Sequence, residues 1–302
     1  MRQKEVTFMA LGTVNKIQVR YPEQDEEMIG DVLDMIVERV TKISENCNFY
    51  DEHSEVGLIN YYAGEKKVKV SYDTLKIIQK GKEYSLKTNG LFDITVGVLT
   101  KLWDINHNDG HIPSRLKIFK AKSLVNVKDI YIEGNSVGLK RKGQMIDLGS
   151  IAKGYCVDLT KEILVSEGIK EAIINYGGSV VTIGKSYHIG IQNPFKKQGE
   201  IIGVLDIQDQ AVVTSGNYEH FFVKNKKRYS HLLDLRKGRP VDNNIASVTL
   251  VADSALEADV YTTVVFMNTS SSYASKLVIL NDGRYYMSDH LRKVFHKVDT
   301  YE

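Results

Sequence analysis

The spacing of apolar residues predicts a strand, two helices and a hairpin in the first half of the chain. Apolar and polar residues alternate over 17–21, as they do in a strand with one buried face. Over 28–43 the apolar residues recur at helical spacing and predict an amphipathic helix. A second helix is expected over 73–85, with Asp73 as its candidate N-cap. The stretch 130–141 is interrupted by Gly-Asn and predicts a hairpin.

A third helix is expected over 150–167, with Ser150 as its cap and Gly168 beyond its end. Short β-rich runs then dominate as far as residue 252. These runs are Ala172–Asn175, Val180–Ile183, Tyr187–Gln192, Ile201–Ile207, Ala211–Thr214 and Ser247–Val251. Helices gathered toward the N-terminus and strands toward the C-terminus predict an α+β fold, with clustered antiparallel strands and packed helices. Because no linker-like stretch interrupts the pattern, residues 1–302 are expected to form a single domain.

Composition excludes several classes of protein. The 40 Lys and Arg nearly balance the 38 Asp and Glu, so no nucleic-acid partner is expected. The most basic run, 224–228, is interpreted as a solvated hairpin turn. Cys47 and Cys156 lack the spacing of a metal site and are expected to act as small buried hydrophobes.

The N-terminal residues are charged, and no apolar signal segment follows them. No run approaches the roughly 20 apolar residues of a membrane-spanning helix, so no membrane span is expected. The sequence as it stands therefore predicts a cytoplasmic protein. An extracytoplasmic location is expected instead if an export signal has been removed.

The segment 146–155 contains a candidate phosphate site. Gly149 and Gly154 flank a predicted helix start, and Lys153 lies in its first turn. Free N–H groups at a helix N-terminus and a nearby ammonium suit an anion such as phosphate. A capped helix with a surface lysine explains the same residues equally well.

Two further turns are rich in glycine and hydroxyl residues. The segment 175–179 contains Gly177 and Gly178, and the segment 214–216 contains Ser215 and Gly216. Each follows a predicted strand, and each is also explained as an ordinary turn. If the two strands are neighbours, their turns would line one phosphate-sized pocket.

Asp259 and Thr263 form a candidate metal pair. In a helix, residues four apart place their Cβ atoms about 5–6 Å apart and can reach one cation. In a strand the same residues would lie roughly 13 Å apart. Asp253 or Ser254 as N-cap and the alanine-rich start that follows favour a helix, although the β-branched residues after it favour a strand. Oxygen ligands suit Mg²⁺ or Ca²⁺, while local backbone hydrogen bonds are the alternative use of both side chains.

His231 lies between apolar residues of a predicted strand. A histidine with a pKa near neutrality is a candidate proton acceptor, although a lone strand histidine is more often structural.

Eight segments of this chain, in this order, resemble the ApbE family of FAD:protein FMN transferases. The resemblance runs from about residue 10 to residue 267. The matching segments are Ala10–Thr13 (A-M-G-T in the family), Phe49–Asn60, Phe92–Gly97 (F-D-x-T-x-G), Ile146–Gly154 (I-D-L-G-G-I-A-K-G), Asn175–Gly178 (N-x-G-G), Thr214–Tyr218 (T-S-G-x-Y), Tyr229–Pro240 and Ala258–Thr263 (A-D-A-L-x-T).

The resemblance implies a role for individual residues. It implies that Asp259, Thr263 and the backbone carbonyl of Ala152 hold Mg²⁺. It implies that Tyr50 stacks on a ring of FAD, and that His231 or Asp259 acts as the catalytic base. The remaining residues that it assigns to FAD binding are Gly12, Thr13, Asp93, Gly149, Lys153, Gly177, Gly178, Ser215 and Gly216.

The activity that the resemblance implies is Mg²⁺-dependent transfer of FMN from FAD to a Thr or Ser hydroxyl of an acceptor protein, with release of AMP. The acceptor is expected to be a separate chain, since no D-x-x-[ST]-G-A-[ST] segment occurs here. An FAD pyrophosphatase and a non-catalytic flavin-binding protein remain as alternatives. Leu11, Ser150, Leu235, Lys237 and Val260–Thr262 depart from the family pattern, but none of these departures removes an implied metal ligand.

Overall fold

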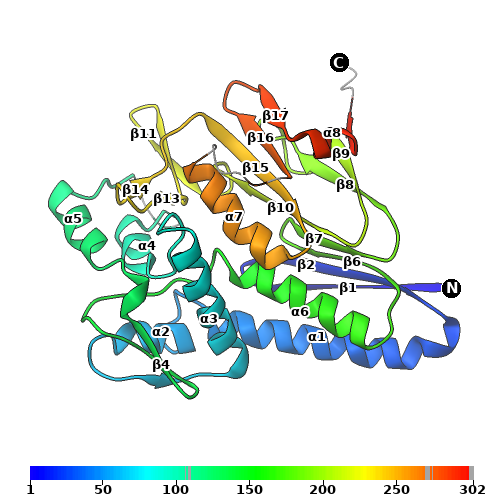
Figure 1. Cartoon of the computed structure of the whole chain (residues 1–302), viewed down its shortest axis with the longest axis horizontal. Helices are drawn as coiled ribbons and strands as arrows, with labels where there is room; N and C mark the ends of the chain where they lie inside the picture. The colour runs from blue at the N-terminus through cyan, green and yellow to red at the C-terminus, as the bar shows by residue number, and fades with distance from the viewer. Residues whose placement is uncertain (106, 108–109, 269–272, 274, 299–302) are drawn as a thin grey trace.

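A large antiparallel sheet runs through the molecule (Figure 1). The structure is a computed structural model that describes residues 1–105, 107, 110–268, 273 and 275–298. Every pairing between neighbouring strands of the large sheet is antiparallel. In spatial order its strands are β1 (Arg2–Ala10), β2 (Thr13–Tyr21), β6 (Glu171–Tyr176), β7 (Ser179–Ile183), β10 (Ala211–Gly216), β15 (Ile245–Ala252), β16 (Lys276–Leu280) and β17 (Tyr285–Met287).

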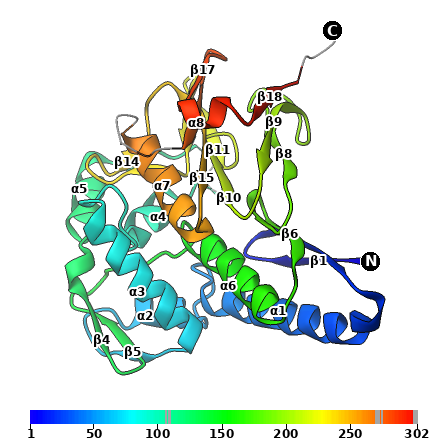
Figure 2. The same ribbon diagram turned by 45° about the vertical axis from the view of Figure 1, so that its right-hand side comes forward.

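Three helices cover one face of this sheet (Figure 2). They are α1 (Glu26–Asn46), α6 (Ala152–Ser166) and α7 (Ala255–Met267). α1 is amphipathic, as predicted, and buries one side of its surface, including Ile29, Leu33 and Ile36. α7 is buried on most sides because it packs against β10 and β15 as well as α6. This burial outweighs the strand preference of its β-branched residues, and the helix expected around Asp259 is confirmed.

The opposite face of the large sheet packs against a smaller one. The smaller sheet orders β18 (Phe295–Lys297), β9 (Ile201–Ile207) and β8 (Tyr187–Gln192). Val212 and Leu277 of the large sheet share a hydrophobic core with Ile189 and Leu205 of the small one. The two sheets therefore enclose a core that is separate from the one beneath the helices. The short helix α8 (Asp289–Arg292) leads into β18.

A largely helical region follows the first helix in sequence. It contains α2 (Glu55–Tyr61), α3 (Tyr72–Lys87), α4 (Gly97–Trp103) and α5 (Arg115–Ser123), with a small sheet of β3 (Val68–Lys69), β5 (Ser136–Leu139) and β4 (Ile130–Glu133). Two hairpins lie near α4 and α5 (Figure 1), namely β11 (Phe221–Lys224) with β12 (Lys227–Ser230), and β13 (Leu233–Asp234) with β14 (Arg239–Pro240). Trp103, Ile118, Phe222 and Leu233 join these parts in a third hydrophobic core.

Most of the expected elements are confirmed, including the hairpin over 130–141 and the solvated turn over 224–228. The strand β1 was not predicted, because most of its side chains are exposed and carry no alternating pattern. Of the three proposed helix caps, Ser254 is confirmed for α7 and the other two were wrong. Ser71 is the N-cap of α3, where Asp73 instead receives hydrogen bonds from Arg39 and Tyr155. Ile151 takes the N-cap position of α6, which lacks a side-chain cap, and the expected Ser150 lies before it.

Both cysteines are buried thiols, as predicted. Burial raises the pKa of Cys47 to about 12, so its reactive thiolate form is suppressed. Among the described residues, no helix combines the length and the apolar character that a bilayer crossing requires.

Candidate active site at the junction of α6 and α7

The N-terminus of α7 is fixed to α6 by one carboxylate. Asp158 of α6 accepts hydrogen bonds from the backbone N–H groups of Ala255 and Leu256 at 2.7 and 3.0 Å. It also accepts one from the hydroxyl of Ser254, which caps α7 through the N–H of Glu257. Asp158 therefore satisfies donors that a helix N-terminus otherwise leaves free, and it sets the position of one helix relative to the other.

Gly154 lets the two helices approach closely. A Cβ atom at this position would lie 2.6 Å from the Cα of Leu256 and 2.7 Å from the carbonyl oxygen of Ala255. Its backbone N–H donates to Oδ2 of Asp259 at 3.0 Å. The absence of a side chain thus brings the start of α6 within hydrogen-bond reach of the aspartate on α7.

Gly154→Ala should destabilise the protein by about 2–3 kcal/mol, because backbone atoms of α7 would have to move to admit the methyl group. Urea denaturation followed by circular dichroism measures this change. Gly30→Ala is the matched control, since a Cβ in that helix would meet only the mobile end of Lys4. The control should gain about 0.5–1 kcal/mol from better helix propensity. Equal stability of Gly154→Ala and the unaltered protein would contradict the close approach.

The predicted metal pair lies on one side of α7, next to the start of α6. Asp259 is buried, and Thr263 is half-buried one helical turn further on. Ala152, whose carbonyl was implied as a third ligand, is the first residue of α6. Burial raises the pKa of Asp259, and the nearby ammonium of Lys153 and the N–H of Gly154 only partly oppose that effect. A further positive charge beside the carboxylate would therefore stabilise its ionised form.

These groups fit a hard divalent cation. The described residues contain no cluster of three or more His, Cys, Asp or Glu that could hold a metal. A site built from Asp259, Thr263 and the carbonyl of Ala152 contains oxygen ligands only, with a single acid. That is the donor set of a Mg²⁺ ion that keeps several waters or substrate phosphates as its other ligands.

Lys153 links the metal pair to a group of ionisable side chains. Its positive charge lowers the pKa of Asp259 and Glu219, and also that of His220 and His231. All four side chains thus lie within its electrostatic reach, and within the described part of the chain no carboxylate forms an ion pair with it. Lys153 is half-buried in the first turn of α6, beside the helix N-terminus. This placement suits an incoming phosphate.

The glycine-rich turns at 175–179 and 214–216 lie at the same end of the large sheet, although β7 separates the strands β6 and β10 that they follow. β7 pairs with β10, and Ser179 lies opposite Val213. The β1–β2 turn joins them, because a Cβ on Gly177 would lie 2.6 Å from the side chain of Thr13. Gly12, Gly177 and Gly178 all have positive φ, which glycine adopts without strain. Gly12, Thr13 and the 177–178 turn therefore meet at one end of adjacent strands.

The end of β10 is tied to α7 and so to the metal pair. The hydroxyl of Ser215 lies 2.9 Å from that of Thr262, which donates to the carbonyl oxygen of Asp259. Gly216 follows directly and is buried. Gly149 lies on an exposed loop before α6, where its N–H donates to Asp147.

His231 connects two short strands and is held by one backbone carbonyl. The carbonyl oxygen of His220 accepts from the backbone N–H of His231 at 3.0 Å and lies 3.3 Å from its Nδ1. The two imidazole rings meet edge to face with centroids 5.5 Å apart. Because a carbonyl can only accept, Nδ1 carries the proton and Nε2 has the free lone pair. Burial lowers the pKa of His231 to about 4, so the ring is neutral at pH 7.

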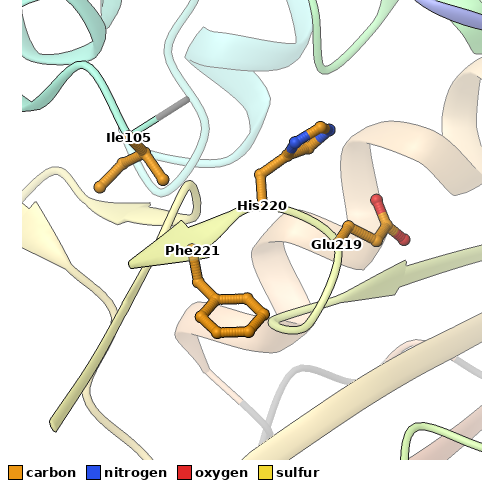
Figure 3. A pocket seen from close by; sticks show the side chains of 4 residues that line it. All are labelled: Ile105, Glu219, His220 and Phe221. Carbon is orange, nitrogen blue, oxygen red and sulfur yellow. The ribbon is translucent and has the colours of Figure 1, made fainter. Parts of the chain in front are cut away.

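A cavity of about 460 Å³ adjoins His220, the first histidine of this pair (Figure 3). It is lined by Ile105, Glu219, His220 and Phe221, and none of these residues was singled out from the sequence. A signal was present, since Glu219 and His220 directly follow the Thr214–Tyr218 segment. Burial raises the pKa of Glu219, and the charge of Asp259 adds to that effect while Lys153 opposes it.

Two of the predicted FAD-binding residues have other surroundings. Tyr50 is 54% exposed and meets the rings of Phe49 and His107 edge-on. Asp93 is buried, and both its carboxylate oxygens accept hydrogen bonds from protein groups, two from Thr95 and one from the N–H of Val127. Asp93 thereby organises the loop before α4. A direct contact of either residue with FAD stays a prediction.

Sequence comparisons with known proteins all indicate the same family. The model of the ApbE family matches residues 11–278. The FAD:protein FMN transferase of Klebsiella pneumoniae is 37% identical over 215 residues, which are 70% of this chain and 68% of that protein. The protein of the same name from Vibrio cholerae is 27% identical over 268 residues, covering 85% of this chain and 79% of that protein.

Solved structures agree with this result across the whole fold. The ApbE protein of Thermotoga maritima has a TM-score of 0.86 and 29% identity, and the match covers 97% of this chain and 99% of that chain. The flavin transferase ApbE of Vibrio cholerae has a TM-score of 0.82 and 25% identity, with 97% and 99% covered. The matched span, the α+β architecture and the order of the site segments lead to one conclusion. This chain belongs to the ApbE family.

Proposed function

We propose that this protein transfers the FMN half of FAD to a Thr or Ser hydroxyl of a separate acceptor protein and releases AMP. The curated relatives are named for transfer of FMN from FAD to protein. The observation that carries the proposal is the placement of Lys153. It lies at the N-terminus of α6, within electrostatic reach of Asp259 and of the neutral His231.

The diphosphate of FAD binds at the start of α6, where the helix N-terminus and Lys153 attract its negative charge. Asp259, Thr263 and the carbonyl of Ala152 would hold Mg²⁺ beside it. Bound there, the ion would supply neutralisation of the charge that grows on the departing AMP. The adjacent turns that carry Gly12, Thr13, Gly177 and Gly178 allow close backbone approach to the rest of FAD.

His231 is the proposed base. Its Nε2 accepts the proton of the acceptor hydroxyl while the oxygen attacks the FMN phosphorus. A phosphorus–oxygen bond to the acceptor forms, and the bond between that phosphorus and the AMP phosphate breaks. Because phosphoryl transfer depends chiefly on positioning and charge, the base contributes less than the groups that hold the diphosphate.

One incubation tests the function against its two alternatives. The protein is mixed with FAD, Mg²⁺ and a recombinant domain that carries a D-x-x-[ST]-G-A-[ST] segment. Covalent flavin fluorescence on that domain in a denaturing gel, with one AMP released per flavin attached, is the expected result. AMP and free FMN without labelled acceptor would support the pyrophosphatase. Bound FAD that stays intact would support a flavin-binding protein without turnover.

A further inference from the structure

Two of the residues that line the cavity beside His220 are held by neighbouring side chains. Ile105 is 9% exposed and belongs to the hydrophobic core around Trp103. Phe221 of β11 is held by Arg228 of β12, whose guanidinium lies 4.3 Å from the centre of the Phe221 ring. Arg228 is itself fixed by a 2.9 Å hydrogen bond to Asn217. These contacts fix the position of both residues in the absence of a ligand, as in the largely preformed sites that small groups usually occupy.

One lining residue, His220, connects the cavity to the proposed base, because its ring meets that of His231 edge to face. His220 lines the cavity and also provides the carbonyl oxygen that fixes the tautomer of His231. Figure 3 shows His220 between Ile105 and Glu219 in the view along the cavity. A group that gives its proton to His231 must come within about 3 Å of Nε2, directly or through one water. The cavity adjoins His220, whose ring meets that of His231, so we take it as the side from which an attacking hydroxyl approaches.

We propose that the cavity lined by Ile105, Glu219, His220 and Phe221 is the acceptor subsite, which receives the polypeptide segment that bears the attacking Thr or Ser hydroxyl. This inference rests on the function proposed above. It names the place where the partner protein meets the enzyme and the residues that select it.

Charge and exposure favour an acceptor segment over part of FAD. Glu219 brings a carboxylate to the wall, and a carboxylate repels the phosphates of FAD but not an uncharged Thr or Ser side chain. His220 is exposed and Phe221 is 39% exposed, so the cavity is open to an incoming protein. The mixture of apolar and polar walls suits a short segment that carries a small hydroxyl residue. Tyr50, the implied partner of an FAD ring, is not among the lining residues.

Phe221→Ala tests the subsite by removing one wall without touching the metal pair. The apparent KM for the recombinant D-x-x-[ST]-G-A-[ST] domain should rise about tenfold, the usual effect of losing an aromatic anchor at an interface. The kcat at saturating acceptor should stay within about twofold. Phe221→Tyr keeps the ring and its contact with Arg228, so it should restore the KM. Phe195→Ala, an equally simple loss of an exposed phenylalanine on the β8–β9 connection, should leave both constants unchanged.

The dissociation constant for FAD, measured by flavin fluorescence on the same variants, identifies the occupant. An unchanged KM for the acceptor in Phe221→Ala would overturn the proposal. A loss of FAD affinity with no selective effect on the acceptor would also overturn it and would assign the cavity to the flavin. Thermal melts of each variant show that it is folded. If the unaltered protein labels no acceptor at all, the function proposed above is wrong, and the acceptor subsite is excluded with it. That outcome is distinguishable from a failure of the subsite alone, in which the unaltered protein labels the acceptor and Phe221→Ala does so with an unchanged KM.

Discussion

Asp259→Ala is expected to abolish Mg²⁺-dependent AMP release from FAD, with a loss on the order of 10³-fold in kcat. The residue is the one acid of the predicted metal set, and it is buried beside the start of α6. Neither Thr263 nor a backbone carbonyl can replace its negative charge. The measurement is AMP formation by chromatography at saturating FAD, over a range of Mg²⁺ concentrations.

Thermal stability separates a lost metal site from a lost fold. Mg²⁺ that binds only the folded protein raises its midpoint of unfolding in proportion to the logarithm of its concentration. Asp259→Asn should keep an acceptor for the Gly154 N–H and remove a carboxylate whose pKa is raised by burial. The Mg²⁺-free variant should therefore melt no lower than the unaltered protein, while its response to Mg²⁺ disappears. Full activity, or a retained Mg²⁺ response, would refute the metal assignment.

His231→Gln is expected to slow transfer to the acceptor by about 10²-fold, at the low end for a general base because positioning dominates this chemistry. In the unaltered protein the ring has a pKa of about 4 and is neutral throughout the range pH 6–8. Its activity should thus stay flat over that range and fall as the pH drops toward 4. Rates measured with the variant should lose this acidic limb. An acidic limb that persists unchanged would show that another group accepts the proton.

Stability should follow the same titration. The pKa of His231 is lowered from 6.5 in a model peptide to about 4 in the folded protein. The unfolded chain therefore binds the proton more readily, and stability falls as the pH drops from about 6.5 toward 4. Above pH 6.5 the contribution is complete. Melting temperatures over pH 4–8 should show a smaller decline in His231→Gln than in the unaltered protein.

Local pattern determined several elements of the fold. The strands over 187–192 and 201–207 begin and end where alternation predicted, because each buries alternate side chains. The helix that carries Asp259 and Thr263 was predicted correctly despite its β-branched residues, because Ser254 caps it and Ala255 begins it. Those features are local, and a sequence contains them directly. The strand β1 lacks them and was therefore missed.

The sequence by itself determined an α+β fold, the helical spacing of Asp259 and Thr263, and three glycine-rich turns as candidates for a phosphate site. Only the tertiary structure decided that Gly154 and Asp158 join α6 to α7. It alone decided that a carbonyl of His220 fixes the tautomer of His231, and that Glu219 and Phe221 line a cavity beside them. These contacts join residues from different elements, whose meeting depends on the packing of the whole chain. Spacing along the sequence records the period of an element but not which other element it packs against.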